Sequence, residues 1–387
     1  MFGSSRSALL LAVAVPLSPA AAQSPSALDS TITATMQEAG IQGLGAAIIV
    51  RGQVVWSQGY GFADHDRTRP FTTRTITKVA SISKPFVGVA MMRAVAEGKL
   101  DLDADINRYL PFRVVNPHHP TRPITLRQLA TMTSSIVDRW EVYAATYRYG
   151  DAPREPLADF LAAYLVPGGK HYAVANFSDA APGTAREYAN IGTALAAYIV
   201  ERAVGTPLNV YTRRHIFTPL GMTHTGWFAD EVPTAHITTH FVAQNGFTIP
   251  IQPYTGTTWP DGALMTSVAD LSRFFLAMLG DGSTGGKRIL DAASTAEMVR
   301  FQFTDANRPT NFPAEDGNSG LFWRTKFGGK RVGFGGNDPG VQAEMLANLT
   351  KDVGVIVLSN TSLSGDEQAA YGKILMAVWA EAERRAK

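Results

Sequence analysis

The sequence contains no cysteine among its 387 residues, which excludes a disulfide framework and a lipid-modified cysteine. Charged residues make up only 18% of the chain, the formal net charge is +2, and no block or stripe of Lys and Arg is present, so no nucleic acid partner is expected. Hydrophobic residues account for 45% of the chain, which is typical of a globular rather than a disordered protein. A chain of this length can bury a large core and suggests about two domains.

Several catalytic and cofactor motifs are also missing. No G-x-S-x-G nucleophile elbow occurs, which argues against the triad of an α/β-hydrolase. There is no phosphate-binding loop and no dinucleotide fingerprint. His236 and His240 have the i, i+4 spacing of a zinc motif, but no Glu follows His236 and no third ligand is evident. We therefore expect neither a cofactor nor a metal site.

The first 22 residues have the features of a secretory signal peptide. Arg6 supplies the positive charge, Ala8–Val15 a short apolar segment, and Ala20–Gln23 a small-residue cleavage site. The apolar segment is too short to span a bilayer, and no later apolar run approaches that length. We expect a secreted protein without a membrane span, located in the periplasm of a Gram-negative bacterium.

Hydrophobic periodicity places strands at both ends of the mature chain and helices between them. Two strand patterns, Gly43–Arg51 and Gln53–Tyr60, flank a hairpin turn after a short helix at Ala27–Ala39. Helical spacing recurs in the segments 126–131, 157–165, 191–204 and 207–216. Strand patterns return at 322–324, 331–334, 342–349 and 353–359, before a final helix at 366–384. This order predicts one sheet from both ends, in an α/β domain of residues 27–80 and 265–387, with a helical domain at 81–264 and the active site in the cleft between them.

A serine precedes a lysine by three residues at the start of a helical pattern, in Ser81-Ile82-Ser83-Lys84. Positions i and i+3 share one face of a helix, so the Ser81 hydroxyl and the Lys84 amine are expected to meet. If the helix begins at Ser81, its backbone N–H also lies at the positive end of the helix dipole, where an anion is favoured. One residue then supplies a nucleophile and part of an oxyanion hole, with a base beside it. The alternative is a surface serine near an ordinary lysine.

Two later motifs carry further candidates. Tyr188-Ala189-Asn190 precedes an apolar helix, and its tyrosine and amide suit proton transfer and carbonyl binding; the alternative is a loop in which Asn190 is the helix N-cap. Residues 333–340 are rich in glycine and form either a simple turn or a strand edge that a substrate approaches closely. Aromatic loop residues either line the cleft or pack in the core; they are Trp140, Tyr143, Tyr147, Trp227 and Trp259.

The order of these motifs resembles the serine β-lactamase and penicillin-binding-protein superfamily, in particular its class C-like branch. Ser81-x-x-Lys84, Tyr188-x-Asn190 and a glycine-rich strand triad follow one another as in that family, and the likeness covers nearly the whole mature chain. Further segments are similar to recurring family segments: residues 59–64, 97–102, 124–129, 182–184 and 219–222. The resemblance implies an α/β (α+β) fold in which an antiparallel sheet, flanked by helices, carries an inserted all-α domain.

The resemblance also implies a role for each motif. Ser81 is then the nucleophile that forms an acyl-enzyme, and Lys84 and Tyr188 share the general-base work. Asn190 orients the substrate carbonyl, and the backbone N–H groups of Ser81 and Asn337 form the oxyanion hole.

The third motif departs from the family pattern. The usual triad has Lys or His, then Thr or Ser, then Gly, whereas this chain has Phe334-Gly335-Gly336. Phe334 has no charge to bind a substrate carboxylate, Gly335 has no hydroxyl to hold one, and the aromatic-Gly-Gly form is similar to the esterase branch. We therefore expect a serine hydrolase of carboxylesterase type, acting on a small-molecule ester. The alternatives are a D-peptidase, DD-carboxypeptidase or class C-like β-lactamase acting on a peptide-like amide, and a non-catalytic acyl-accepting sensor. The sequence indicates no oligomeric state.

Overall fold

The computed structural model describes residues 26–150, 154–313 and 317–387. The predicted signal peptide, residues 1–22, lies outside the described residues. Within the described ranges, no helix combines the length and the apolar character needed to cross a bilayer.

A six-stranded antiparallel sheet joins the two ends of the chain, as predicted, in the strand order β11-β12-β13-β14-β1-β2. The early hairpin consists of β1 (Gly43–Val50) and β2 (Gln53–Gly61). The late strands are β11 (Arg324–Lys326), β12 (Arg331–Asp338), β13 (Val341–Asn348) and β14 (Val353–Ser359). Because β1 pairs with β14, the first and last strands of this sheet in sequence order lie side by side in its interior.

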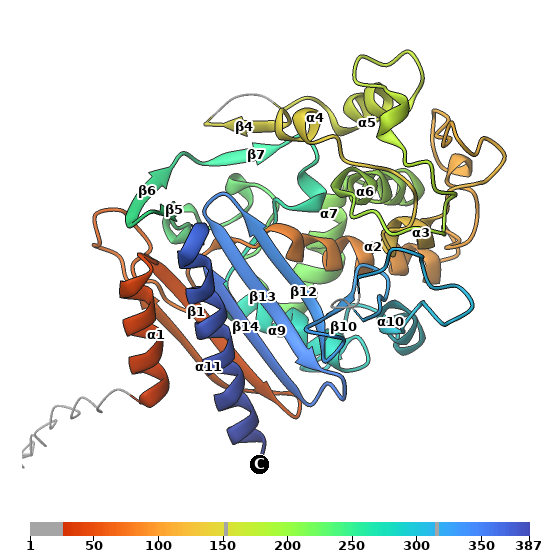
Figure 1. Cartoon of the computed structure of the whole chain (residues 1–387). Helices are drawn as coiled ribbons and strands as arrows, with labels where there is room; N and C mark the ends of the chain where they lie inside the picture. Colours follow the sequence, from red (N-terminus) through yellow and green to blue (C-terminus); the bar gives the residue numbers. More distant parts are fainter. Residues whose placement is uncertain (1–25, 151–153, 314–316) are drawn as a thin grey trace, which may run out of the picture.

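Helices cover both faces of this sheet. On one face, α1 (Ala27–Glu38) and α11 (Gln368–Ala386) run side by side (Figure 1). On the other face, α9 (Val268–Leu279) packs against β1 and β14. Every residue of β1 is buried, with Ala46 and Ile48 in the core under α11 and Ala47 and Ile49 in the core on the opposite face. This double coverage explains why β1 reads as a continuous apolar run and not as an alternating one.

Residues 81–264, which were predicted to form an all-α domain, are mostly helical but also contain short strands. The hairpin of β5 (His240–Gln244) and β6 (Phe247–Ile251) turns at Asn245-Gly246, where both residues have positive φ, 54° and 76°. An Asn-Gly pair suits such a turn because both residues tolerate left-handed backbone, so the signal was present in the sequence. The other helices are α2 (Ser83–Ala96), α3 (Leu126–Ala130), α4 (Trp140–Ala144), α5 (Leu157–Leu165), α6 (Asn190–Val204), α7 (Leu208–Thr212), which a π-helix continues at Arg213–Phe217, α8 (Thr218–Leu220) and α10 (Ala292–Val299). The other strands are β3 (Thr77–Lys78), β4 (Tyr147–Tyr149), β7 (Tyr254–Gly256), β8 (Met265–Thr266), β9 (Ser283–Thr284), β10 (Lys287–Arg288) and β15 (Thr361–Leu363).

Two boundaries differ from the prediction in ways that affect the site. The helix predicted from Ser81 begins at Ser83, and Ser81 lies in a preceding 3₁₀ turn, η1 (Ala80–Ile82). The strand predicted at 331–334 continues to Asp338, so most of the glycine-rich segment is strand β12 and the turn follows at Pro339-Gly340. The early end predicted for that strand was wrong because its glycines pair with β13 along the whole segment.

Candidate active site

Ser81 is held in a tight turn that enters α2. Ala80, immediately before it, has a φ of 46°, a left-handed conformation that costs energy for a residue with a side chain. The buried hydroxyl of Ser83 stabilises this turn, because it donates to Ala80 O at 2.7 Å and accepts from Leu264 N–H at 3.0 Å. The turn therefore presents the half-buried Ser81 side chain while the rest of the motif is buried.

Lys84 connects the candidate residues to one another. Its side chain is fully buried, and Nζ donates to Ser81 Oγ at 3.0 Å, Asn190 Oδ1 at 2.7 Å and the Asp261 carbonyl oxygen at 2.8 Å. A lysine ammonium has three hydrogens, so these acceptors use all of them. The Tyr188 hydroxyl donates to Ser81 Oγ at 2.9 Å. The structure thus brings Ser81, Lys84, Tyr188 and Asn190 together, with two titratable groups within hydrogen-bond distance of the Ser81 hydroxyl.

A buried aspartate positions Asn190. Asp138 accepts from the backbone N–H groups of Asn190 at 2.6 Å and Ile191 at 3.0 Å, and so caps the N-terminus of α6. Burial raises the pKa of Asp138, while the two N–H groups and then Lys84 oppose that shift. Asn190 is the first residue of α6 and not its N-cap, which leaves its side chain to bind Lys84.

The third motif supplies backbone to the site. A Cβ on Gly336 would meet Val79 O at 2.2 Å and Ser81 N at 3.0 Å, so only glycine lets β12 come this close to the serine turn. A Cβ on Gly335 would instead meet Glu344 and Lys326, which form an ion pair on the opposite face. Phe334 is buried in the core, with its ring 5.6 Å from the Arg324 guanidinium. Of the predicted binding residues, Gly336 and Asn337 therefore adjoin Ser81, whereas Phe334 and Gly335 do not.

A cavity of about 290 Å³ opens beside Ser81. Both the middle segment and the sheet region contribute to its wall, which consists of Ala80, Ser81, Trp140, Tyr143, Tyr147, Asn190, Asp261, Gly262, Asn337, Asp338, Pro339, Ser362 and Leu363. Among these described residues there are two carboxyl groups and no Arg, Lys or His. Three of the five aromatic candidates line the cavity, whereas Trp227 and Trp259 pack edge to face away from it.

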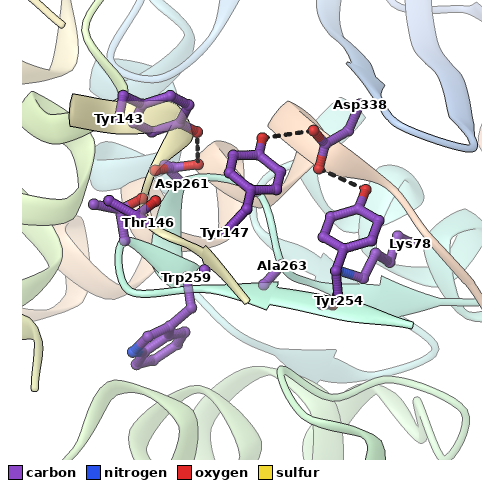
Figure 2. Close-up of a pocket in the computed structure, with 12 residues that line it drawn as sticks. Lys78, Tyr143, Thr146, Tyr147, Tyr254, Trp259, Asp261, Ala263 and Asp338 are labelled. Atoms are coloured by element: carbon purple, nitrogen blue, oxygen red, sulfur yellow. Dashed lines mark hydrogen bonds between the residues drawn. The ribbon is translucent and has the colours of Figure 1, made fainter. Parts of the chain in front are cut away.

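Tyrosines hold the two carboxyl groups of this cavity, which also line a small neighbouring pocket (Figure 2). Tyr143 donates to Asp261 Oδ1 at 3.0 Å, and Tyr147 and Tyr254 donate to the two oxygens of Asp338 at 2.6 and 2.8 Å. Burial raises the pKa of Asp261 to about 6, against the opposing charge of Lys84. Burial also raises the pKa of Asp338, which the Tyr147 hydrogen bond and Lys78 oppose.

Comparison with known proteins identifies the family. The beta-lactamase family model matches residues 28–377. The chain belongs to the beta-lactamase family. Within this fold, Ser81 has a lysine and a tyrosine within hydrogen-bond distance of its hydroxyl.

Three similar proteins illustrate the range of this β-lactamase family. Protein flp of Staphylococcus aureus strain MRSA252 is 26% identical over 253 residues, which are 64% of this chain and 47% of the relative. Esterase EstB of Burkholderia gladioli is 32% identical over 210 residues, 53% of this chain and 52% of the relative. The octameric penicillin-binding protein homologue of Pyrococcus abyssi superposes with a TM-score of 0.73 at 25% identity, covering 93% of this chain and 77% of that one. The chain thus spans about half the length of the curated relatives it matches.

Sequence reasoning missed the carboxyl groups of this β-lactamase-family site. Asp138 lies 52 residues from Asn190 in the sequence and Asp261 lies 177 residues from Lys84, so no local spacing marks these two carboxyl groups. Asp338 alone had an indirect signal, because it directly follows Asn337 at the end of the glycine-rich segment.

Proposed function

We propose that this serine hydrolase is a carboxylesterase-type enzyme that cleaves small-molecule esters lacking a carboxylate, through an acyl-enzyme on Ser81. The observation that carries the proposal is the wall of the Ser81 cavity, which has Asp261 and Asp338 and no cationic side chain among its described residues. A substrate carboxylate would meet two acids there and no counter-charge, which is unfavourable in a partly buried site. An ester with an uncharged alcohol group pays no such penalty. The 32% identity to an esterase supports the same choice.

The proposed reaction has two steps. Ser81 Oγ attacks the ester carbonyl carbon, and its proton passes to the Tyr188–Lys84 pair, which lies 2.9 and 3.0 Å away. The reacting form of the pair holds one proton fewer than a phenol with an ammonium, so it has a site for the serine proton. The same pair then protonates the leaving alkoxide, the ester C–O bond breaks, and the alcohol departs. In the second step water attacks the acyl-enzyme, the pair takes a proton from the water, and Ser81 Oγ recovers one as the acid is released.

Asn190 and two backbone groups bind the substrate carbonyl region in this mechanism. The Asn190 oxygen accepts from Lys84, so its NH₂ group is the part left to donate to the substrate. The N–H groups of Ser81 and Asn337 form the oxyanion hole. Asn337 lies on strand β12, which Gly336 allows to pack against the serine turn. Removing one such donor typically costs about 3–4 kcal/mol in the activation barrier.

A panel of substrates on purified protein tests the proposal. We expect rapid turnover of short-chain p-nitrophenyl esters, slow turnover of nitrocefin and of a D-Ala-D-Ala peptide, and a loss of at least about 10³-fold in kcat/KM for Ser81→Ala. Ser57→Ala, which changes an exposed serine of β2, is the matched control and keeps full activity. Ester turnover that survives Ser81→Ala contradicts the mechanism, and nitrocefin turnover above ester turnover supports a β-lactamase instead. A stable acyl adduct on Ser81 without turnover, seen by mass spectrometry, identifies a sensor.

We also propose that the protein is secreted to the periplasm after removal of residues 1–22, on the strength of Arg6 and the apolar segment that follows it. N-terminal sequencing of protein from the periplasmic fraction is expected to start at Gln23. Protein that remains in the cytoplasm with Met1 intact contradicts this proposal.

A further inference from the structure

We infer that the cavity beside Ser81 selects esters that carry a positively charged amine, with the Asp261 carboxylate as the counter-ion of that amine. The inference rests on the proposed ester hydrolysis and assigns it a substrate class. Asp261 lies close to the nucleophile, because Lys84 Nζ binds both Ser81 Oγ and the Asp261 carbonyl oxygen. Asp261 lines the same cavity as Ser81 and Asn190.

One oxygen of this carboxylate has no partner. Tyr143 donates a hydrogen bond to Oδ1, but Oδ2 is buried and accepts no hydrogen bond from the described residues. The Thr258 hydroxyl lies close enough to favour the charged form of Asp261 but not close enough to form a hydrogen bond with Oδ2. Asp261 is only 4% exposed, so bulk water does not solvate this oxygen. A buried carboxylate oxygen that lacks a donor is costly. An ammonium group in the adjacent cavity supplies the opposite charge that stabilises this carboxylate.

The charges around the site leave room for one more cation. Three buried or largely buried carboxyl groups, Asp138, Asp261 and Asp338, interact electrostatically with two lysines, Lys78 and Lys84. Burial raises the pKa of all three carboxyl groups even with the lysines present. With all five groups ionised the cluster carries one excess negative charge, and a bound ammonium neutralises it.

The cavity wall also suits a cation. Trp140, Tyr143 and Tyr147 line it, and aromatic faces attract ammonium groups, most strongly where water is excluded. Tyr143 and Tyr147 pack edge to face with ring centres 5.9 Å apart, which holds the two rings in fixed orientations next to the acids. Aromatic rings beside a carboxylate are the usual means of binding quaternary amines.

An isosteric ester pair tests the inference. Glycine betaine methyl ester carries a permanent trimethylammonium group, and methyl 3,3-dimethylbutanoate has the same shape without the charge. At pH 7.5 we expect the ratio of their kcat/KM values to fall by at least about 10-fold in Asp261→Asn. Using the ratio removes any effect that the substitution has on chemistry common to both esters. Glu141→Gln, which removes an exposed charge on α4, is the matched control and is expected to change the ratio by less than about 2-fold.

A binding measurement separates this inference from the proposed function, because it needs no turnover. We expect choline to bind wild-type protein at least about 10-fold more tightly than the isosteric 3,3-dimethyl-1-butanol by calorimetry, and Asp261→Asn to remove that preference. Equal affinities for the two alcohols, or an ester ratio that Asp261→Asn leaves unchanged, overturn the inference and assign the Oδ2 position to a buried water. If neither ester is hydrolysed but choline is preferred, the ester function fails and the cation site stands. If Asp261→Asn does not fold, the wild-type preference alone decides.

Discussion

Lys84 is the residue on which the geometry of the site depends. Each of its three hydrogens goes to a different part of the chain: the Ser81 hydroxyl on η1, the amide at the start of α6 and the carbonyl of Asp261. Because Lys84 is fully buried, its substitution would remove one donor from each of these three acceptors, of which Ser81 Oγ would keep Tyr188. The spacing in Ser81-x-x-Lys84 therefore does more than place a lysine near a serine.

The pKa of Asp261 predicts a change of stability with pH. Burial raises this pKa from 3.8 to about 6 in the folded protein, so the folded state binds the proton more tightly than the unfolded chain does. The favourable contribution is complete below pH 3.8 and is lost as the pH rises through about 6. Asp261→Asn removes this titration. We therefore expect the free energy of unfolding of the variant to rise by about 3 kcal/mol relative to that of wild type as the pH increases from 4 to 7. Urea denaturation at several pH values measures the difference.

A second aspartate gives the opposite trend and serves as the control. Arg127 lowers the pKa of Asp103 through a hydrogen bond, so Asp103→Asn is expected to lose stability relative to wild type as the pH rises over the acidic range. Two variants with the same dependence on pH would contradict both assignments.

At the scale of single elements, strand β12 approaches the serine turn through a glycine. A methyl group on Gly336 would meet the backbone oxygen of Val79 at 2.2 Å, and a backbone atom cannot rotate away. We expect Gly336→Ala to lower kcat/KM by about 100-fold or more, since a shift of the strand displaces one oxyanion donor. Gly372→Ala in α11 is the control, because no atom lies within 4 Å of the added methyl, and it is expected to raise stability by about 0.5–1 kcal/mol. Full activity in Gly336→Ala would mean that the strand is not held this closely.

The start of α6 depends on a side chain from a distant loop. Asp138 accepts two backbone N–H groups there, so we expect Asp138→Ala to cost about 2 kcal/mol in stability and to lower kcat/KM by about 10-fold or more, as Asn190 loses its position. Thermal unfolding and steady-state kinetics measure the two effects. Asp291→Ala removes a comparable cap from α10 and is expected to lower stability while leaving kcat unchanged. Equal kinetic effects in both variants would indicate a general loss of stability.

At the scale of the whole molecule, the two chain ends form one sheet that supports the site. Trp379 of α11 packs under this sheet at 4% exposure, with the Arg331 guanidinium 3.9 Å from its ring. We expect Trp379→Ala to lower the free energy of unfolding by about 3–5 kcal/mol and to shift the loss of activity and of circular dichroism to the same lower temperature. Trp140→Ala, at a site that is 68% exposed and lines the cavity, is expected to change substrate binding and leave stability within about 0.5 kcal/mol. Activity lost well below the structural transition in Trp379→Ala would contradict a single supporting sheet.

The sequence by itself determined the sheet hairpin at Arg51-Gly52, the sheet formed from both ends, and the meeting of Lys84, Tyr188 and Asn190 around Ser81. These features follow from local rules: turn residues, period-2 and period-3.6 patterns, and the i, i+3 relation between Ser81 and Lys84. The ordered motifs then identified Tyr188 and Asn190, more than 100 residues away.

Only the tertiary structure decided which carboxyl groups surround the cavity and how the chain segments around Ser81 are placed. It buried Phe334 and turned Gly335 away from the serine, and it started α2 two residues after Ser81. It also brought Asp138, Asp261 and Asp338 to one place and buried them wholly or in part, which raised their pKa values. Burial is a property of the whole packed molecule, so no local pattern in the chain records which carboxyl groups lose their solvent.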